Sequence, residues 1–293
     1  RFYADKEGSE VDPELKAEHA AAVAPLTAFV RHVAAEADRS LRGSNAGSQD
    51  AAARCATAWL SAWANGGALL GRMETRQAEY QRKFDFTGLA LAWLKVRNRA
   101  GADHRRAIDD WLARLADASL AFFDDRGRKR NNHWYWLGAG LAATSYATGS
   151  ERHWLAARGI FADAARDISA EGYLPMELER RARALHYHAF ALMPLVVMAE
   201  IAAVKGEDWA ALGDGALHRL VGRTLAGLDD PAIFERRAGT AQERPLRTGA
   251  GWLPLYMLRH GDRIRPKVVT MVPGHRWLGG DVRLLASALS SGR

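Results

Sequence analysis

The chain has 293 residues, which is enough for one large hydrophobic core or two smaller ones. Its 41 Lys and Arg residues against 34 Asp and Glu residues give a net charge of +7, which favours an anionic partner. The single cysteine, Cys55, excludes an intramolecular disulfide, and we expect it to be a small buried apolar side chain. No apolar run approaches the ~20 residues that span a bilayer, because the strongest candidate, 190–204, contains Pro194 and Glu200.

The apolar pattern is helical through most of the chain. Trp59, Leu60 and Trp63 fall on one helical face, and a similar spacing recurs in 89–96 and 108–115. Alanine is frequent, which suits helix interiors and close helix packing. Chain breakers separate segments of about 12 to 20 residues. These breakers lie at 43–48, 65–67, 124–127, 149–150, 172–175, 206, 213–215 and 229–231.

The end of the chain departs from this pattern. The run 267–272 has the composition of a strand, and Pro273, Gly279 and Gly280 favour turns. No repeat of fixed sequence is visible, and no long polar linker divides the chain. We therefore expect an all-α fold of antiparallel helical hairpins in one domain, with a short irregular or β-containing tail.

The segment Asn-Asn-His-Trp-Tyr-Trp at 131–136 is the most informative part of the sequence. Two amides, an imidazole and three aromatic rings suit the binding of a sugar that carries a carboxylate better than they suit a buried core. Trp136 stands one helical turn after Asn132, so we expect flat rings at the mouth of a polar site. The alternative is an ordinary capped helix start, in which His133 bonds to the backbone.

A second polar cluster lies at 180–188. Arg180, Arg183 and Tyr187 have the spacing i, i+3 and i+7, which predicts that they share one face of a helix. Two guanidinium groups beside a phenol would lower its pKa from about 10. The alternative is a solvated basic helix with a half-buried tyrosine. His186 and His188 flank Tyr187 on different faces, so they cannot both line one site. Together the two clusters supply the groups needed to remove a proton beside a carboxylate.

Other patterns in the chain do not indicate a site. The segment 138–143 fits G-x-G-x-x-A but follows no strand, so it does not predict dinucleotide binding. We expect the acidic pairs 109–110, 124–125 and 229–230 at helix ends, where they meet the helix dipole, and not as the two acids of a glycosidase. No metal-ligand spacing of the usual kinds is present, and we expect neither a metal nor an organic cofactor.

The segment 130–136 resembles the N-N-H-x-Y-W signature of the alginate lyases of polysaccharide lyase family 5. The segments 58–64, 172–181, 184–188 and 278–282 continue the resemblance in order, and 172–181 is similar to the family's G-x-L-P-x-E-L-x-R-R stretch. The resemblance implies an incomplete (α/α) toroid over residues 1–293, with residues 1–20 as a mobile lid over a deep cleft. It also implies cleavage of β-1,4-linked polyuronates by a bacterial protein in the periplasm or outside the cell, matured by loss of a leader peptide.

Carried over by position, Asn132, His133, Arg180 and Tyr187 match the family's catalytic quartet. In β-elimination, Tyr187 is expected to take the proton from C5 and to protonate the leaving oxygen, with His133 as the alternative base. The other residues would neutralise the C6 carboxylate. The side chains expected to bind substrate are Tyr3, Lys6, Gln77, Tyr80, Trp134, Trp136, Arg183, His186 and Arg276.

The resemblance has two departures that bear on the substrate. Trp134 and His186 stand where the family often has Ser and Ala, so we expect altered sugar subsites. Because mannuronate and glucuronate differ only at C2, the expected range includes polyglucuronate and hyaluronan as well as polymannuronate. The alternatives are a toroid glycoside hydrolase and a non-catalytic binder of acidic polysaccharide. We expect a monomer with no membrane partner, and no nucleic-acid partner because the basic residues are dispersed and form no recognition motif.

Overall fold

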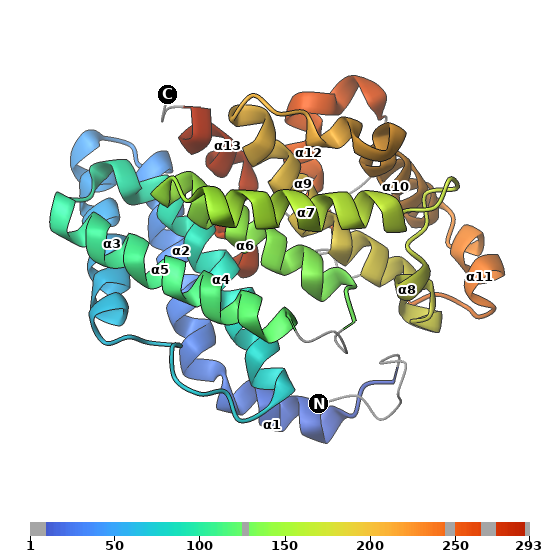
Figure 1. The fold of residues 1–293 in the computed structure, drawn as a ribbon, viewed down its shortest axis with the longest axis horizontal. Coiled ribbons are helices and arrows are strands. Elements are labelled where there is room, and N and C mark those ends of the chain that lie inside the picture. The colour runs from blue at the N-terminus through green and yellow to red at the C-terminus, as the bar shows by residue number, and fades with distance from the viewer. Residues whose placement is uncertain (1–9, 125–128, 244–249, 265–273, 291–293) are drawn as a thin grey trace.

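The computed structural model describes residues 10–124, 129–243, 250–264 and 274–290, and nearly all of these are helical (Figure 1). The α-helices are α1 (Pro13–Ala22), α2 (Ala24–Arg42), α3 (Ala46–Asn65), α4 (Arg76–Val96), α5 (Ala102–Phe123), α6 (Asn132–Thr148), α7 (Glu151–Asp167), α8 (Pro175–Leu178), α9 (Ala184–Val204), α10 (Leu212–Asp229), α11 (Ala232–Ala238), α12 (Leu253–His260) and α13 (Val282–Ser290). Short 3-10 turns are η1 (Arg97–Arg99), η2 (Arg181–Arg183), η3 (Trp209–Ala211), η5 (Gly261–Arg263) and η6 (Arg276–Leu278). The strands β1 (Gly274–His275) and β2 (Gly280–Asp281) pair antiparallel around η6.

The helices are arranged in two layers (Figure 1). Helices α2, α4, α6 and α9 form the inner layer, in which each packs against the next, and α3, α5, α7 and α10 lie outside them. Helices α12 and α13 pack on α9 and on each other. This arrangement is the incomplete (α/α) toroid that the sequence predicted. The β1–β2 pair confirms a short β-containing tail, whereas the expected strand at 267–272 lies outside the described residues.

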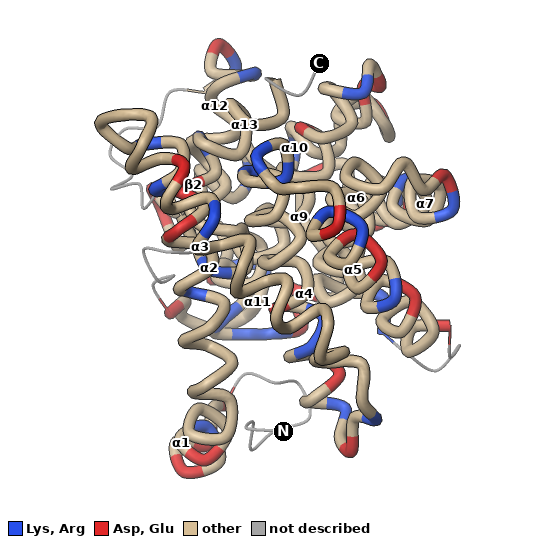
Figure 2. Tube along the Cα trace, turned by 90° about the vertical axis from the view of Figure 1, so that its left-hand side faces the viewer, with Lys and Arg blue, Asp and Glu red and all other residues tan. Residues whose placement is uncertain are grey.

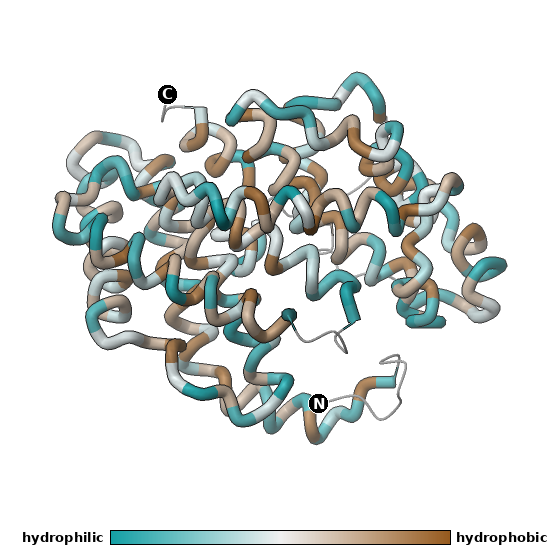
Figure 3. The backbone as a smooth tube through the Cα atoms, viewed as in Figure 1, coloured by the Kyte–Doolittle hydropathy of each residue, from teal (hydrophilic) through white to brown (hydrophobic). Residues whose placement is uncertain are grey.

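Burial separates the two layers. Helix α4 is buried on every face from Gln81 to Val96, and α6 and α9 are nearly as enclosed. Helices α5 and α7 bury one face and expose the other, which is the pattern of amphipathic outer helices. Figure 3 shows this as hydrophilic and hydrophobic residues alternating along the outer helices. The inner helices therefore carry the core, and they also carry most of the predicted site.

The expectation that no apolar run is long enough to span a bilayer was wrong for helix α9 and the turn before it. Residues 181–204 are long and apolar enough to cross a membrane by composition alone. However, 89% of the most apolar window of this segment is buried inside the fold. Its hydrophobicity is therefore that of a core helix enclosed by its neighbours. Pro194 lies inside this helix without ending it.

A fully buried lysine fixes the tail to the inner helices. The Nζ atom of Lys95 donates to Asp38 Oδ1 at 2.6 Å, to the carbonyl of Gly279 at 2.6 Å and to the carbonyl of Asp281 at 3.0 Å. The tail also lies very close to α4, because a Cβ atom on Gly88 would be 2.3 Å from the carbonyl oxygen of Arg276. These contacts set the position of η6.

Candidate active site

The first turn of α6 holds two of the predicted catalytic residues. Asn131 caps this helix by accepting from the backbone N–H of His133 at 3.2 Å. Asn132 is fully buried, and its backbone N–H and its Nδ2 both donate to Glu177 Oε1 at 2.8 Å. This carboxylate fixes which end of the Asn132 amide carries the nitrogen. The Oδ1 atom of Asn132 has no hydrogen-bond partner within the described part of the chain.

Arg180, Arg183 and Tyr187 come together, but not on one helix as predicted. Arg181 has φ of 51°, and the chain forms a 3-10 turn at 181–183 before α9 begins at Ala184. The Cζ atoms of Arg180 and Arg183 nevertheless lie 4.5 and 5.2 Å from the centre of the Tyr187 ring. The predicted helical face is therefore wrong, while the predicted proximity of the three side chains is confirmed.

Glu177 connects the two clusters. Its Oε2 atom lies 3.7 Å from Nε of Arg180, while its Oε1 holds Asn132. His133 follows Asn132 in the first turn of α6. Burial first, and then the charges of Lys83 and Arg180, hold the pKa of its imidazole well below the ordinary value. The four residues expected to be catalytic are thus gathered at one place from α6, the α8–α9 connection and the start of α9.

Lys83 is a member of the site that the sequence did not reveal. Its Nζ atom lies 2.8 Å from Nδ1 of His133 and 3.6 Å from the centre of the Phe84 ring. The side chain is fully buried, and burial lowers the pKa of its amine well below the ordinary value. A lysine thus stands directly behind the imidazole of the site.

Aromatic rings surround the quartet. Tyr80 stacks on His133 with ring centres 3.8 Å apart, and Phe84 stacks on Trp277 at 4.3 Å. Phe190 contacts Phe84 at 5.8 Å and Tyr187 at 6.2 Å, so the rings run from one cluster to the other. We call Tyr80, Phe84, Phe190 and Trp277 the aromatic cluster. Its members other than Phe84 are partly exposed, which suits the stacking of a sugar ring.

One of the expected sugar platforms, Trp136, is wrong because its ring is fully buried between Phe84 and Phe190 on an inner helix. This ring therefore belongs to the packing between helices. Trp134 is 7% exposed, and its Nε1 donates to Asp163 on α7 at 3.0 Å, so its role in binding stays a prediction. Sequence reasoning missed the partly exposed rings of the aromatic cluster except for Tyr80.

The remaining predicted binding residues are distributed around this region. His186 is partly exposed and stacks on Phe190 at 6.2 Å, and burial lowers its pKa to about 4, with a smaller effect from Arg183. Gln77 lies half-buried one turn before Tyr80 on α4, so its role stays a prediction. Tyr3 and Lys6 lie outside the described residues.

Arg276 and Trp277 reach the site from the tail. The guanidinium of Arg276 lies 4.4 Å from the Trp277 ring centre, and Asp85 accepts from Trp277 Nε1 at 2.8 Å and from Gln81 Nε2 at 2.6 Å. Burial raises the pKa of Asp85 to about 6, although these two hydrogen bonds and the charge of Arg276 oppose the shift. Asp85 therefore orients Trp277, and no signal in the sequence indicated it.

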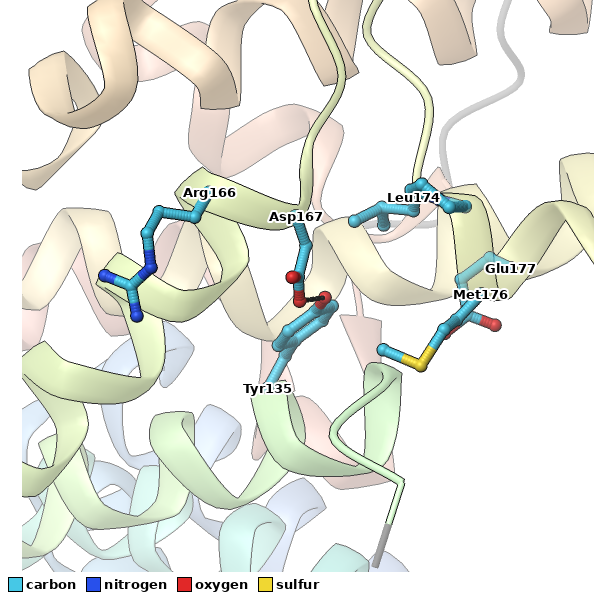
Figure 4. A pocket seen from close by; sticks show the side chains of 7 residues that line it. Tyr135, Arg166, Asp167, Leu174, Met176 and Glu177 are labelled. Atoms are coloured by element: carbon cyan, nitrogen blue, oxygen red, sulfur yellow. Dashed lines mark hydrogen bonds between the residues drawn. The ribbon is translucent and has the colours of Figure 1, made fainter.

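A cavity of about 280 Å³ lies between α6, the end of α7 and the start of α8 (Figure 4). In it, the hydroxyl of Tyr135 donates to Asp167 Oδ2 at 3.1 Å. Burial is the main cause that raises the pKa of the Asp167 carboxyl. The cavity shares Glu177 with the site. Its lining residues are Tyr135, Arg166, Asp167, Leu174, Pro175, Met176 and Glu177.

One group of side chains in the described ranges has ligand atoms close enough together to hold a metal ion. The ligand atoms of His32, Glu36 and Cys55 lie within 4.8 Å of one another, on α2 and α3. Glu36 already pairs with Arg39 at 3.1 Å, and these residues are not among those of the site. Cys55 is partly exposed with its Sγ 3.6 Å from His32 Nε2, so the expectation of a buried apolar cysteine was wrong.

The acidic pairs are also placed differently from the prediction. Asp109 lies inside α5, where it accepts from Trp93 Nε1 and from Arg97 Nη2, each at 2.7 Å. Asp124 and Asp229 stand at the C-terminal ends of α5 and α10, where the helix dipole disfavours a negative charge. The capping explanation was therefore wrong for Asp109, which has a structural role in α5, and for Asp124. It is confirmed for Asp230, whose Oδ1 accepts from the backbone N–H of Ala232 at 3.1 Å at the start of α11.

The comparisons with known proteins identify the family of the chain. A family model described as alginate lyase matches residues 2–234. The chain is 42% identical to a polysaccharide lyase of Stenotrophomonas maltophilia (strain K279a). The 291 aligned residues cover 98% of this chain and 86% of the relative. It is 34% identical over 273 residues to an alginate lyase of Azotobacter vinelandii, with 88% of this chain and 72% of the relative covered.

Two solved structures have the same fold. Alginate lyase A1-III from Sphingomonas species A1 has a TM-score of 0.81 and 23% identity, over 98% of this chain and 82% of that one. Alginate lyase A1-III complexed with tetrasaccharide has a TM-score of 0.84 and 22% identity, over 98% and 81%. Identities this low establish the fold alone, whereas the family model and the more similar sequences establish the family. The chain belongs to the alginate lyase family.

Proposed function

We propose that this protein cleaves β-1,4-linked uronate polymers, alginate first among them, by β-elimination. The observation that carries the proposal is the position of Glu177, which holds Asn132 through one oxygen and faces Arg180 with the other. Arg180 in turn lies over the ring of Tyr187. An amide, a guanidinium, an imidazole and a phenol thus surround one small region, as proton removal beside a carboxylate requires.

The first task of the site is to make the proton on C5 acidic. Removal of this proton places a second negative charge beside the C6 carboxylate, so the carboxylate must be neutralised. Arg180 supplies a positive charge. Glu177 occupies one of the two Nδ2 hydrogens of Asn132 and leaves the other to donate to the carboxylate. His133 adds a third donor.

Tyr187 is the group proposed to move the proton. As a phenolate it takes the proton from C5, the C4–O4 bond breaks while a C4=C5 double bond forms, and the same proton passes to O4. In β-D-mannuronate the C5 hydrogen and O4 lie on one side of the ring, so one group can perform both steps. His133 is the alternative base for a uronate whose C5 hydrogen points to the opposite face.

The proposed substrate range extends from polymannuronate to polyglucuronate and hyaluronan. Its support is the equivalence of mannuronate and glucuronate at every carbon except C2, together with the bulky His186 and Tyr80 beside the quartet. Trp134 adds nothing to this support, because its Nε1 donates to Asp163 on α7. A periplasmic or secreted location and a monomeric state remain predictions.

A glycoside hydrolase is less well supported. It needs two carboxyl groups facing the substrate. The nearest acids, Glu177 and Asp85, are buried and already accept hydrogen bonds from Asn132, Gln81 and Trp277. A non-catalytic polysaccharide binder would use the same basic and aromatic surface, and only turnover separates it from a lyase.

The test is to follow ultraviolet absorbance of unsaturated products, with EDTA present, on polymannuronate, polyguluronate, polyglucuronate and hyaluronan. The wild-type protein is expected to give a rise on polymannuronate that Tyr187→Phe abolishes while polymer binding persists. Tyr146→Phe is the matched control, because this hydroxyl donates to the Leu289 carbonyl at 3.0 Å and turnover should survive its loss. No rise on any polymer, or full activity in Tyr187→Phe, would overturn the mechanism.

A further inference from the structure

The buried amine of Lys83 has an unusual environment. Its Nζ lies 2.8 Å from Nδ1 of His133, and within the described ranges no carboxylate pairs with it. Its other close neighbours are the rings of Phe84 at 3.6 Å and Tyr80 at 5.3 Å. Burying an amine costs several kcal/mol unless partners offset it. A contribution to the stability of the fold therefore does not explain why a lysine occupies this position.

Lys95, one helix face away on α4, provides the contrast. It is equally buried, but its Nζ donates to the Asp38 carboxylate and to two backbone carbonyls. These partners offset its burial and fix the tail. Lys95 thus has the environment of a structural lysine, and Lys83 does not.

We propose that Lys83 is a positioning residue that donates a hydrogen bond to Nδ1 of His133 and thereby keeps the imidazole hydrogen on Nε2, facing the substrate. An ammonium group can only donate, and a neutral amine keeps two N–H bonds that can donate in the same geometry. The lone pair of Nδ1 accepts this bond, and the neutral ring then carries its only hydrogen on Nε2. Stacking of Tyr80 on the imidazole at 3.8 Å and 12° holds the ring plane.

The inference rests on the proposed function and decides a question within it. An imidazole with its hydrogen on Nε2 can donate to the uronate carboxylate but cannot take a proton at that nitrogen. The low pKa of His133 agrees with a neutral ring, since burial and then Lys83 and Arg180 disfavour the imidazolium. The hydrogen bond from Lys83 therefore makes His133 a donor to the uronate carboxylate, and Tyr187 is the group that transfers the proton.

The experiment combines ¹⁵N NMR of labelled histidine with kinetics of the full chain. The His133 signals are assigned by their loss in His133→Gln. In the wild-type protein, Nε2 is expected to be protonated and Nδ1 unprotonated. Lys83→Met removes the donor at similar length, so the ring should become a mixture of tautomers and kcat should fall by roughly 10- to 100-fold. Lys83→Gln keeps an N–H donor and should recover most of that loss.

Lys95→Met is the control for a purely structural effect. It should lower Tm and leave the His133 tautomer unchanged, whereas Lys83→Met should keep or raise Tm because it removes an amine without a carboxylate partner. A wild-type ring protonated on Nδ1, or unchanged kcat and tautomer in Lys83→Met, would overturn the inference. If no polymer is cleaved, the proposed function fails, and the tautomers of wild type and variants still decide the role of Lys83.

Discussion

At the scale of single residues, Glu177 is the buried carboxylate on which two substrate-facing groups depend. It is 1% exposed, accepts twice from Asn132 and lies 3.7 Å from Arg180. Burial raises its pKa, while Arg180 and the two Asn132 hydrogen bonds oppose the shift. Its value to the site lies in geometry, because Oε1 holds Asn132 through two hydrogen bonds while Oε2 faces the guanidinium of Arg180.

Glu177→Gln should therefore damage catalysis more than folding. The amide keeps the shape of the side chain but loses the charge that faces Arg180, so Asn132 and Arg180 should lose their orientation. We expect kcat to fall by roughly 10- to 100-fold with a smaller change in KM. The matched control is Glu179→Gln, an exposed residue of the same segment that pairs with Lys129 at 3.6 Å, and its kcat should be unchanged. Equal kcat values for the two variants would refute this role.

The sequence predicted the quartet because its residues lie in two short motifs. Glu177 was visible only as part of a family-like stretch, and Lys83 gave no signal at all. Both act through contacts with partners 45 and 50 positions away in the chain. Periodicity describes one helix at a time, so it cannot predict which buried side chain stands behind a given imidazole. The same limit explains why Trp136 was expected at the surface.

At the scale of elements, His188 joins the start of α9 to the segment before α8. The backbone N–H of Leu174 donates to His188 Nε2 at 2.9 Å, and Nδ1 lies 2.8 Å from the Ala184 carbonyl. The ring must accept at Nε2 and donate at Nδ1, which only the neutral imidazole can do. Burial lowers the pKa of His188 to about 4, although the bond to Ala184 opposes the shift.

This histidine predicts how stability depends on pH. A histidine whose folded pKa lies below its unfolded value of about 6.5 stabilises the fold above that value, and the stabilisation is lost as the pH falls toward the folded pKa. His186 and His188, both with pKa about 4, should therefore make the free energy of unfolding fall between pH about 6.5 and about 4. Each contributes a slope of up to about 1.4 kcal/mol per pH unit.

Asp85 acts in the opposite direction. Its pKa of about 6 lies above the ordinary value of 3.8, so its contribution favours folding at low pH and is lost as the pH rises through about 6. Denaturant unfolding across this range should show the summed slope. His188→Gln should reduce the slope by up to about 1.4 kcal/mol per pH unit, the contribution of one proton. An undiminished slope in His188→Gln would contradict the assignment.

The contact between α4 and the tail gives a second prediction at this scale. A Cβ atom on Gly88 would lie 2.3 Å from the Arg276 carbonyl and 3.0 Å from the Trp277 Cα, both backbone atoms. Gly88→Ala should therefore displace η6, lower Tm and raise KM by moving Trp277. Gly159→Ala on the exposed face of α7 has open space and should instead stabilise the protein by about 0.5–1 kcal/mol. A Gly88→Ala variant with wild-type Tm and KM would contradict this close packing.

Helices were predicted well where the apolar period is long, as in α3 and α5. The prediction failed at 180–187, where Arg181 adopts a left-handed φ of 51° and ends any continuous helix. No residue in that stretch is a glycine or proline, so the break has no local signal. The contacts of Arg180 and Arg183 with Tyr187 survive because the 3-10 turn returns both side chains to the first turn of α9.

At the scale of the whole molecule, the toroid follows from hairpins in which three of the inner helices, α4, α6 and α9, are buried on nearly every face. The all-α class could be predicted from periodicity, but the toroidal order of the helices required the family resemblance. The net charge of +7 fits a polyanionic substrate, although Figure 2 shows basic segments mixed with acidic ones along the chain. Local geometry around Tyr187, and not the overall charge, therefore carries the functional argument.

The most direct test of β-elimination is the mass of the products from polymannuronate, measured with EDTA present. Elimination adds no water, so one fragment from each cleavage should be lighter by one water than a saturated oligouronate of the same length. That fragment should also carry an olefinic C4 hydrogen in its NMR spectrum. Saturated fragments would mean hydrolysis, and an uncut but bound polymer would mean a binding protein. Either result would contradict the mechanism assigned to Tyr187.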